Sequence, residues 1–175
     1  MIDIFSSKER LKSQPLSRKN IREIARWLKS ELKLNLNQKV DIIQVFEILA
    51  LLLNYDYEFV SDESMKGKYA ETDIVNRVIR VRESVFKRAA EGIPRDRFTI
   101  AHEIGHFVFH CFLGFSLCRS TEDVKSYEDP EWQANTFAGE FLADSGMIKG
   151  LSPFEVADKY GVSREVALIQ LNNAK

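Results

Sequence analysis

Residues 102–106 read H-E-I-G-H, and in a helix the spacing of the two histidines places both side chains on one face. Residues four apart on an α-helix lie about 40° apart around the axis and about 6 Å apart along it, so His102 and His106 project from one face. Glu103 is turned by about 100° from His102. A helix here offers two imidazole nitrogens to one metal ion, with a carboxylate beside them that can reach a water molecule. The alternative is a chance pentapeptide in a buried helix.

A catalytic zinc site needs three protein ligands and one open position. The chain has three histidines, all in or just after this segment. His110 would lie about 80° around the helix and about 12 Å along it from His102, so we expect it to pack or to support the site. The third ligand must then be a carboxylate. The candidates that follow the motif are Glu122, Asp123, Glu128, Asp129, Glu131 and Glu140.

Glu131 is the predicted third ligand. Pro130 suits the first position of a helix and Asp129 suits its N-cap, so Glu131 falls in the first turn, and small alanines along its flank permit close packing. Asn135, one turn further on, is predicted to hydrogen-bond a histidine ring nitrogen. Glu140 lies about 180° around this helix from Glu131, so both cannot face the metal.

Size and composition are those of one globular domain, because 175 residues can bury a core and 45% of them are hydrophobic. The formal charge of -1 argues against a protein that coats nucleic acid or anionic membranes. The N-terminus lacks the pattern of a secretory signal, and the most apolar stretch, residues 42–53, is too short to span a bilayer. With only Cys111 and Cys118, a disulfide framework is not expected. We therefore expect a cytoplasmic chain without membrane contact.

Hydrophobic periodicity predicts helices, then a small sheet, then helices again. Ser17 can cap a first helix, and Asp41 can start a second that runs through residue 53. The expected strands cover residues 55–60, 68–71 and 77–82. Pro94 is expected to close a loop, and the later helices to cover residues 97–111, 130–142, 152–160 and 163–172. The predicted class is α+β, a helical bundle with a small antiparallel or mixed three-stranded sheet.

Two motifs resemble the ImmA/IrrE metallo-endopeptidases, a family formerly described as a domain of unknown function. They are R-F-T-I-A-H-E-I-G-H at 97–106 and E-W-Q-A-N-T-F-A-G-E-F-L at 131–142, in the family's order and approximate separation. The resemblance implies a zincin-like core of the gluzincin type, with His102, His106 and Glu131 as ligands of one Zn²⁺ and Glu103 as the catalytic base. The chain departs from the family after Leu142, where A-D-S-G follows and the family often has a proline.

The resemblance also implies a protein substrate. Members of the family commonly cleave a helix-turn-helix repressor, often encoded beside them, and so release genes of mobile elements, phages or stress responses. We therefore expect a zinc-dependent endopeptidase that acts as an antirepressor. The alternative is a regulatory or partner-binding protein, of a transcription-regulation or toxin–antitoxin type, that uses a peptidase scaffold without proteolysis.

The C-terminal residues 155–171 resemble a helix-turn-helix, with Gly161 at the turn. Residues 152–175 carry three basic and three acidic side chains, however, and phosphate contacts need a basic face. Direct DNA binding is therefore not expected. We expect residues 1–150 to form the zinc peptidase domain and residues 151–175 to form a helical pair that packs on the same domain.

Two further assignments concern the substrate and the transition state. Residues 77–97 include seven basic and three acidic side chains. We predict that Arg77, Arg80 and Arg82 belong to an edge strand along which the substrate lies, the alternative being a solvated edge whose charges discourage aggregation. The histidines are all in or beside the motif helix, so the group that stabilises the oxyanion of the transition state must be a tyrosine, an arginine or a backbone amide. Tyr127 and Tyr69 are candidates.

Overall fold

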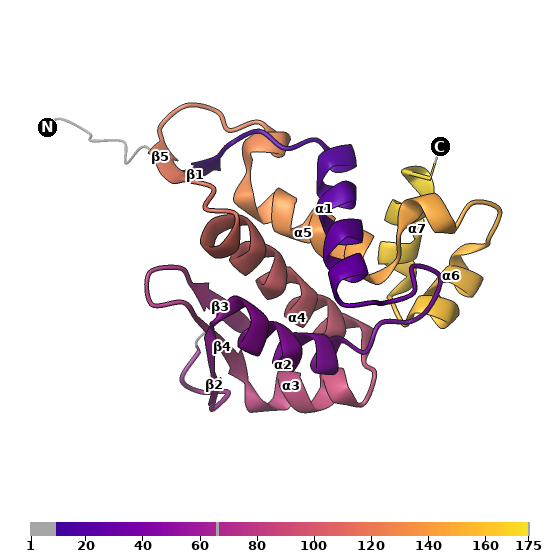
Figure 1. Ribbon diagram of the computed structural model, residues 1–175, viewed down its shortest axis with the longest axis horizontal. Helices are drawn as coiled ribbons and strands as arrows, with labels where there is room; N and C mark the ends of the chain where they lie inside the picture. Colours follow the sequence, from indigo (N-terminus) through magenta and orange to yellow (C-terminus); the bar gives the residue numbers. More distant parts are fainter. Residues whose placement is uncertain (1–9, 66, 175) are drawn as a thin grey trace, which may run out of the picture.

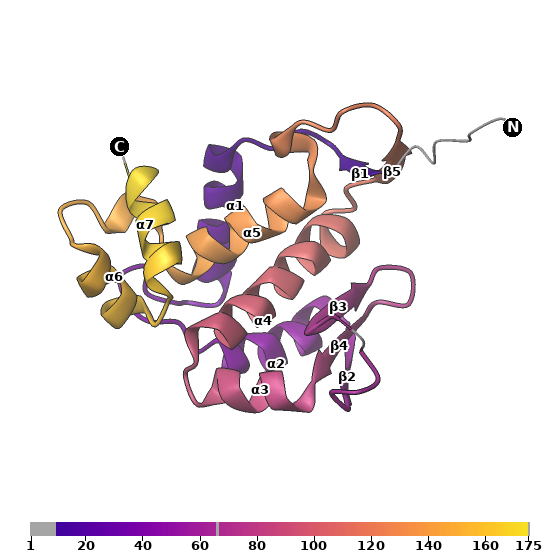
Figure 2. The ribbon, with the colours of Figure 1, turned by 180° about the vertical axis from the view of Figure 1, so that it is seen from behind.

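The helix that carries His102 and His106 runs through the middle of the molecule, with other helices and a small sheet packed around it (Figures 1 and 2). A computed structural model describes residues 10–65 and 67–174. Within these ranges the chain forms seven α-helices, two small sheets, and short π and 3₁₀ segments. The predicted α+β class is therefore confirmed.

The helices are α1 (Arg18–Glu31), α2 (Ile42–Leu53), α3 (Glu83–Ala90), α4 (Pro94–His106), α5 (Pro130–Leu142), α6 (Pro153–Tyr160) and α7 (Arg164–Asn172). The strands are β1 (Arg10–Ser13), β2 (Asp56–Val60), β3 (Ala70–Asp73), β4 (Val78–Arg82) and β5 (Leu117–Ser120). α4 continues directly into a π-helix, η1 (Phe107–Phe112). The short 3₁₀ segments are η2 (Ser126–Glu128) and η3 (Ser145–Met147).

Side-chain caps begin most of the helices that the sequence predicts. In each case a side-chain oxygen accepts a hydrogen bond from a backbone N–H of the first turn, at 2.9–3.3 Å. The capping residues are Ser17, Asp41, Asp129, Ser152 and Ser163. Capping satisfies backbone donors that have no partner inside the helix. Because only a few residue types can do this, the starts of these helices can be predicted from the sequence.

Four elements differ from the prediction. α4 begins at Pro94, not near residue 97, because proline suits a first turn whose N–H groups have no partner in the helix. α3 is an additional helix that follows β4 without a linker and buries Val85 and Ala89. β1 and β5 are additional strands that pair antiparallel, with Arg10 opposite Ser120. A pairing between segments so distant in the chain leaves no local pattern.

The three-stranded sheet has the order β2-β4-β3, with β2 parallel and β3 antiparallel to β4. The prediction that β4 is an edge strand for the substrate is therefore wrong, because both of its sides are already paired. Val78, Ile79 and Val81 are all buried, and apolar residues on both faces are typical of a central strand. β3 is the edge strand that packs against α4.

The three arginines of this segment hold the sheet in place. Arg80 pairs with the carboxylates of Glu58 and Asp73, at 2.8 and 3.4 Å. Arg77 donates to backbone carbonyls at the end of α2 and in η1, and Arg82 donates to the carbonyl of Met65. Their guanidinium groups therefore have partners within the fold, and a substrate role for them is not supported.

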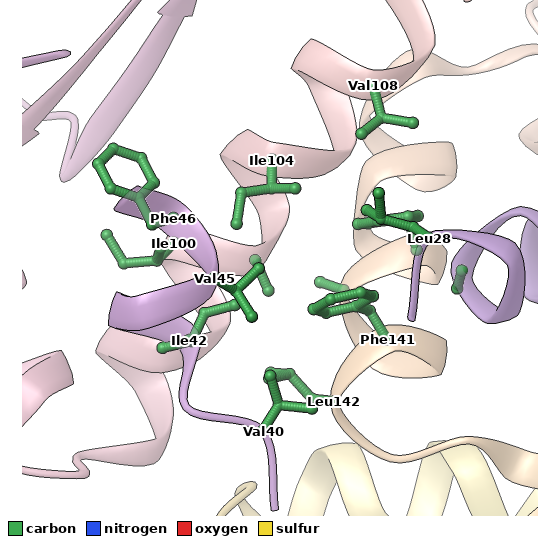
Figure 3. Packing of buried hydrophobic residues seen from close by; sticks show 14 of the residues in the cluster. Leu28, Val40, Ile42, Val45, Phe46, Ile100, Ile104, Val108, Phe141 and Leu142 are labelled. Carbon is green, nitrogen blue, oxygen red and sulfur yellow. The ribbon is translucent and has the colours of Figure 1, made fainter. Parts of the chain in front are cut away.

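The buried face of α4 fixes the direction of the histidines. Ile100 and Ile104 lie in the core with residues of α1, α2 and α5 (Figure 3). Ile104 is two positions from each of His102 and His106, which is about 200° around the helix. Because Ile104 is buried against the core, both histidines point to the opposite side of α4.

The C-terminal helices pack onto the rest of the fold. Val156, Tyr160 and Ala167 are buried in the main hydrophobic cluster. Gln170 Nε2 donates to the carbonyl of Ala143 at 2.8 Å, at the end of α5. The domain boundary at residue 150 stays a prediction. None of the helices within residues 10–65 and 67–174 has both the length and the apolar character needed to cross a membrane.

Lys29 is an unusual member of the core between α1 and α5. It is 1% exposed, its ammonium group lies 5.5 Å from the centre of the Phe141 ring, and Nζ has no hydrogen-bond partner among the described residues. Burial lowers the pKa of Lys29 to about 8 despite the nearby charges of Asp144 and Glu140. Folding therefore opposes the charged form of this side chain.

Replacing Lys29 with methionine is expected to stabilise the protein by about 1–3 kcal/mol near neutral pH, because it removes a buried charge and keeps the volume. The folded pKa lies below the unfolded value of 10.5, so below pH 8 the cost is present in full, and it is relieved as pH rises towards 10.5. Urea unfolding at about pH 7 and about pH 9.5 should show the gap between Lys29→Met and wild type narrowing. Equal gaps at both pH values would contradict this account of Lys29.

Candidate metal centre

Three side chains from two helices converge on one point. His102 Nε2 and His106 Nε2, both on α4, lie 3.0 Å apart. The Glu131 carboxylate, on α5, lies 3.3 Å from His102 Nε2 and 3.2 Å from His106 Nε2. These are the three residues in the described ranges that could hold a metal ion as a group.

The donor atoms fit a tetrahedral metal ion. Ligand atoms that bind zinc at about 2.0–2.1 Å in tetrahedral geometry lie about 3.3–3.4 Å from one another. The observed separations of 3.0–3.3 Å are within a few tenths of an ångström of that spacing. Two imidazoles and one carboxylate are also the ligand types that zinc prefers, and the fourth position is left for water or substrate.

Asn135 determines which nitrogen of His102 faces the cluster. His102 Nδ1 lies 2.9 Å from Asn135 Oδ1, and a carbonyl oxygen can only accept, so Nδ1 carries the proton. Nε2 then faces His106 and Glu131, where it can either donate a proton to the Glu131 carboxylate or offer its lone pair to a metal ion. Three lone-pair donors that converge in this way are favourable around a cation or a shared proton.

The charges of the cluster reinforce one another. Hydrogen bonds from His102 and His106 hold the pKa of the Glu131 carboxyl well below its usual range. Burial lowers the pKa of His102, but the hydrogen bond to Glu131 and the charges of Glu103 and Glu131 outweigh burial and raise it. Protons and a metal ion therefore compete for the same nitrogen, so metal binding at this cluster would release protons.

Close packing of α4 against α5 brings Glu131 to the histidines. Gly105 faces α5, and a Cβ at this position would lie 3.0 Å from Phe137 Cδ1 and 3.3 Å from Ala134 Cα. A larger side chain would push the helices apart. Asp129 and Pro130 set the start of α5, so that Glu131 stands in its first turn as the sequence predicts.

Glu103 lies beside the cluster and is held by a residue that sequence reasoning missed. Its side chain is 6% exposed, and Thr72 Oγ1 on β3 donates to Glu103 Oε2 at 2.7 Å. Thr72, Glu103 and the three clustered residues line one cleft of about 440 Å³. Thr72 stands in the short strand A-E-T-D, and nothing in that strand points to the histidine helix.

The other residues predicted to belong to the site differ in how close they lie to the metal cluster. His110 is outside the cluster, with Nδ1 3.0 Å from the carbonyl of Phe115, and burial lowers its pKa. Tyr69 lines a small cavity of about 230 Å³ together with His102 and Glu103. Tyr127 lines neither this cavity nor the cleft, and its ring faces the Lys125 ammonium. The structure therefore supports Tyr69 as a residue near the centre and gives no such support to Tyr127.

Two histidines one helical turn apart, a glutamate from a second helix and a buried carboxylate next to them are the donor set of zinc-dependent peptidases. The class that the fold and this centre define is a metallopeptidase. The chain belongs to the IrrE N-terminal-like domain family, Peptidase_M78, whose sequence model matches residues 58–172. The match covers 115 of the 175 residues and includes the cluster, Glu103 and Thr72, so the predicted ImmA/IrrE membership is confirmed. No curated protein matches the chain significantly.

Proposed function

We propose that the chain is a zinc-dependent endopeptidase that cleaves a helix-turn-helix repressor in the cytoplasm and so acts as an antirepressor. The observation that carries the proposal is the convergence of His102, His106 and Glu131 at 3.0–3.3 Å, with the Glu103 carboxylate in the same cleft. Membership of a peptidase family supports a protein substrate. The repressor itself is inferred by analogy with the ImmA/IrrE peptidases.

In the proposed reaction His102, His106 and Glu131 hold one Zn²⁺. The ion would polarise the scissile carbonyl and lower the pKa of water towards about 7. Glu103 accepts the proton of the attacking water and later delivers it to the leaving amine. Thr72 donates to one carboxylate oxygen of Glu103, and the other oxygen, Oε1, makes no hydrogen bond to a described residue, so it is available for that proton.

Tyr69 is the proposed donor to the oxyanion of the transition state. The guanidinium groups of Arg82 and Arg95 both pack against its ring, with their central carbons 5.1 and 4.2 Å from the ring centre. These two arginines restrict the orientation of the ring, and a restricted donor costs less reorganisation when the charge develops.

The proposal is tested by incubating the purified chain with a helix-turn-helix repressor encoded by a neighbouring gene. We expect one cut, mapped by mass spectrometry, that a metal chelator prevents and that added zinc restores. An intact repressor under these conditions would refute the antirepressor role. A repressor that is bound and inactivated without a cut would instead support the non-proteolytic alternative.

Replacing Thr72 with valine is expected to slow cleavage about tenfold, because Glu103 loses the hydroxyl that holds its carboxylate. The protein should fold normally, since valine keeps the shape and β-propensity of threonine. Thr72→Ser is the matched control, because it restores the hydroxyl and should restore most of the rate. The measurement is kcat with the substrate in excess. Equal rates for Thr72→Val and wild type would contradict a positioning role.

A further inference from the structure

A second groove leads away from the metal centre. It has a volume of about 690 Å³ and lies between α4, α5 and α7. It shares Phe98, Thr99 and Asn135 with the small cavity that Tyr69, His102 and Glu103 line. The groove therefore adjoins the cavity beside the centre at Asn135, the side chain that orients His102. The cleft that contains the metal cluster and β3 residues is also lined by His102. A peptide bound across the centre therefore has room on more than one side.

The groove has an apolar lining that other parts of the described chain leave open. Phe98 of α4, Trp132 of α5, and Val166 and Ile169 of α7 all line it. Ile169 is 45% exposed although it belongs to the wall of a groove. Burying such side chains against an apolar partner favours a complex because it removes apolar surface from water. The lining therefore suits a large apolar side chain of the occupant.

Arg95 lines the groove and is, among the described residues, a cation without an ion-pair partner. Its guanidinium group lies over the Tyr69 ring at 4.2 Å. The other arginine of the groove, Arg18, is already close to the Glu140 carboxylate, at 3.6 Å. The acidic residue of the wall, Glu165, belongs to the first turn of α7. A carboxylate that lies next to the apolar side chain of the occupant would therefore find its partner in Arg95.

We infer that this groove binds a peptide segment of the substrate in which a large apolar residue is followed or preceded closely by an acidic one. The inference rests on the proposed peptidase function, because it treats the groove as an extension of the active-site cleft. It also assigns a role to α7: its residues Val166 and Ile169 select the substrate. The helix-turn-helix-like tail then serves recognition of protein and not of DNA.

The test uses the full-length chain with E103Q, loaded with zinc, and a phage-displayed library of random dodecapeptides. Enriched sequences are synthesised with a fluorescent label, and their affinities are measured by fluorescence anisotropy. We expect the enriched peptides to place Leu, Ile, Met or Phe within two positions of Asp or Glu. Adding Ile169→Asp or Arg95→Glu to that chain should each weaken binding at least about tenfold.

Two control variants match these changes. Leu168→Asp introduces the same charge at the neighbouring position of α7, 50% exposed and outside the groove lining, and Lys87→Glu reverses an exposed charge on α3. Both should bind within about twofold of the parent chain. In addition, Arg95→Glu should prefer peptides in which the acidic residue is replaced by lysine.

Failure to enrich any peptide, or enriched peptides whose binding Ile169→Asp and Arg95→Glu leave unchanged, would overturn the inference. Equal losses from Leu168→Asp and Ile169→Asp would overturn it too. Binding does not require cleavage, so the two proposals can fail separately. Peptides that bind through the groove, together with a wild-type chain that cuts no repressor, would refute the peptidase. A repressor cut equally well by wild type and by Ile169→Asp in the active chain would refute the groove.

Discussion

Replacing Glu103 with glutamine is expected to lower the rate of repressor cleavage by about 10²–10⁴-fold and to leave metal binding intact. Glutamine has the same shape, and its amide oxygen can still accept from Thr72, which donates to Glu103 at 2.7 Å. It cannot accept the proton of water. The rate of cleavage and the metal content should be measured on the same preparation. Loss of the catalytic base lowers the rate and leaves the metal content unchanged, whereas loss of a metal ligand lowers both.

Glu71→Gln is the matched control for this change. Glu71 lies on β3 next to Thr72, lines the same cleft and pairs with Lys68 at 2.8 Å. Because its carboxylate is engaged with Lys68, removing its charge should change the rate by less than about threefold. A Glu103→Gln protein that cleaves at the wild-type rate would contradict the assignment of the base, even if the metal site is correct.

Replacing Glu131 with alanine is expected to remove the metal from the protein under conditions in which wild type retains it. Two histidines remain, which is one ligand fewer than catalytic zinc sites use. The loss of affinity should exceed the roughly 10–100-fold that removing an outer hydrogen-bond partner of a ligand costs. Titration of the apo-protein with zinc against a chelating dye measures this directly.

Two variants calibrate that titration. Asn135→Ala removes the acceptor for His102 Nδ1, so its loss of affinity should fall within about 10–100-fold. Glu128→Ala removes a nearby carboxylate that pairs with Lys12 at 3.2 Å and lies outside the cluster, so its affinity should match wild type. The order wild type, Asn135→Ala, Glu131→Ala is the expected result. Zinc affinity of Glu131→Ala equal to wild type would refute the proposed third ligand.

The sequence predicts the histidine helix and its partner helix well because the signals are local. The H-E-x-x-H spacing requires one helical face, and Asp129 and Pro130 mark where α5 begins. Together they place Glu131 in a first turn, and the small residues at Gly105 and Ala134 allow the approach of the two helices. These relations can be worked out without knowing the rest of the fold.

The surroundings of the centre could not be predicted because they depend on contacts between distant segments. Thr72 reaches Glu103 because the β3–β4 hairpin packs on α4, and β3 itself gives no sign of that packing. The arginines of β4 suggest an edge strand. The strand is central because β2 and β3 pair with its two sides, and it buries residues on both faces. The wall of the groove comes from α7, whose packing against α5 no local pattern reveals.

The most direct measurement is an anomalous-difference map at the zinc absorption edge from crystals of the zinc-loaded, full-length chain. The account predicts one peak about 2.0–2.2 Å from His102 Nε2, His106 Nε2 and a Glu131 carboxylate oxygen, with Glu103 close by but outside bonding distance. Absence of a peak between these three side chains, or a peak bound through His110 in their place, would contradict it.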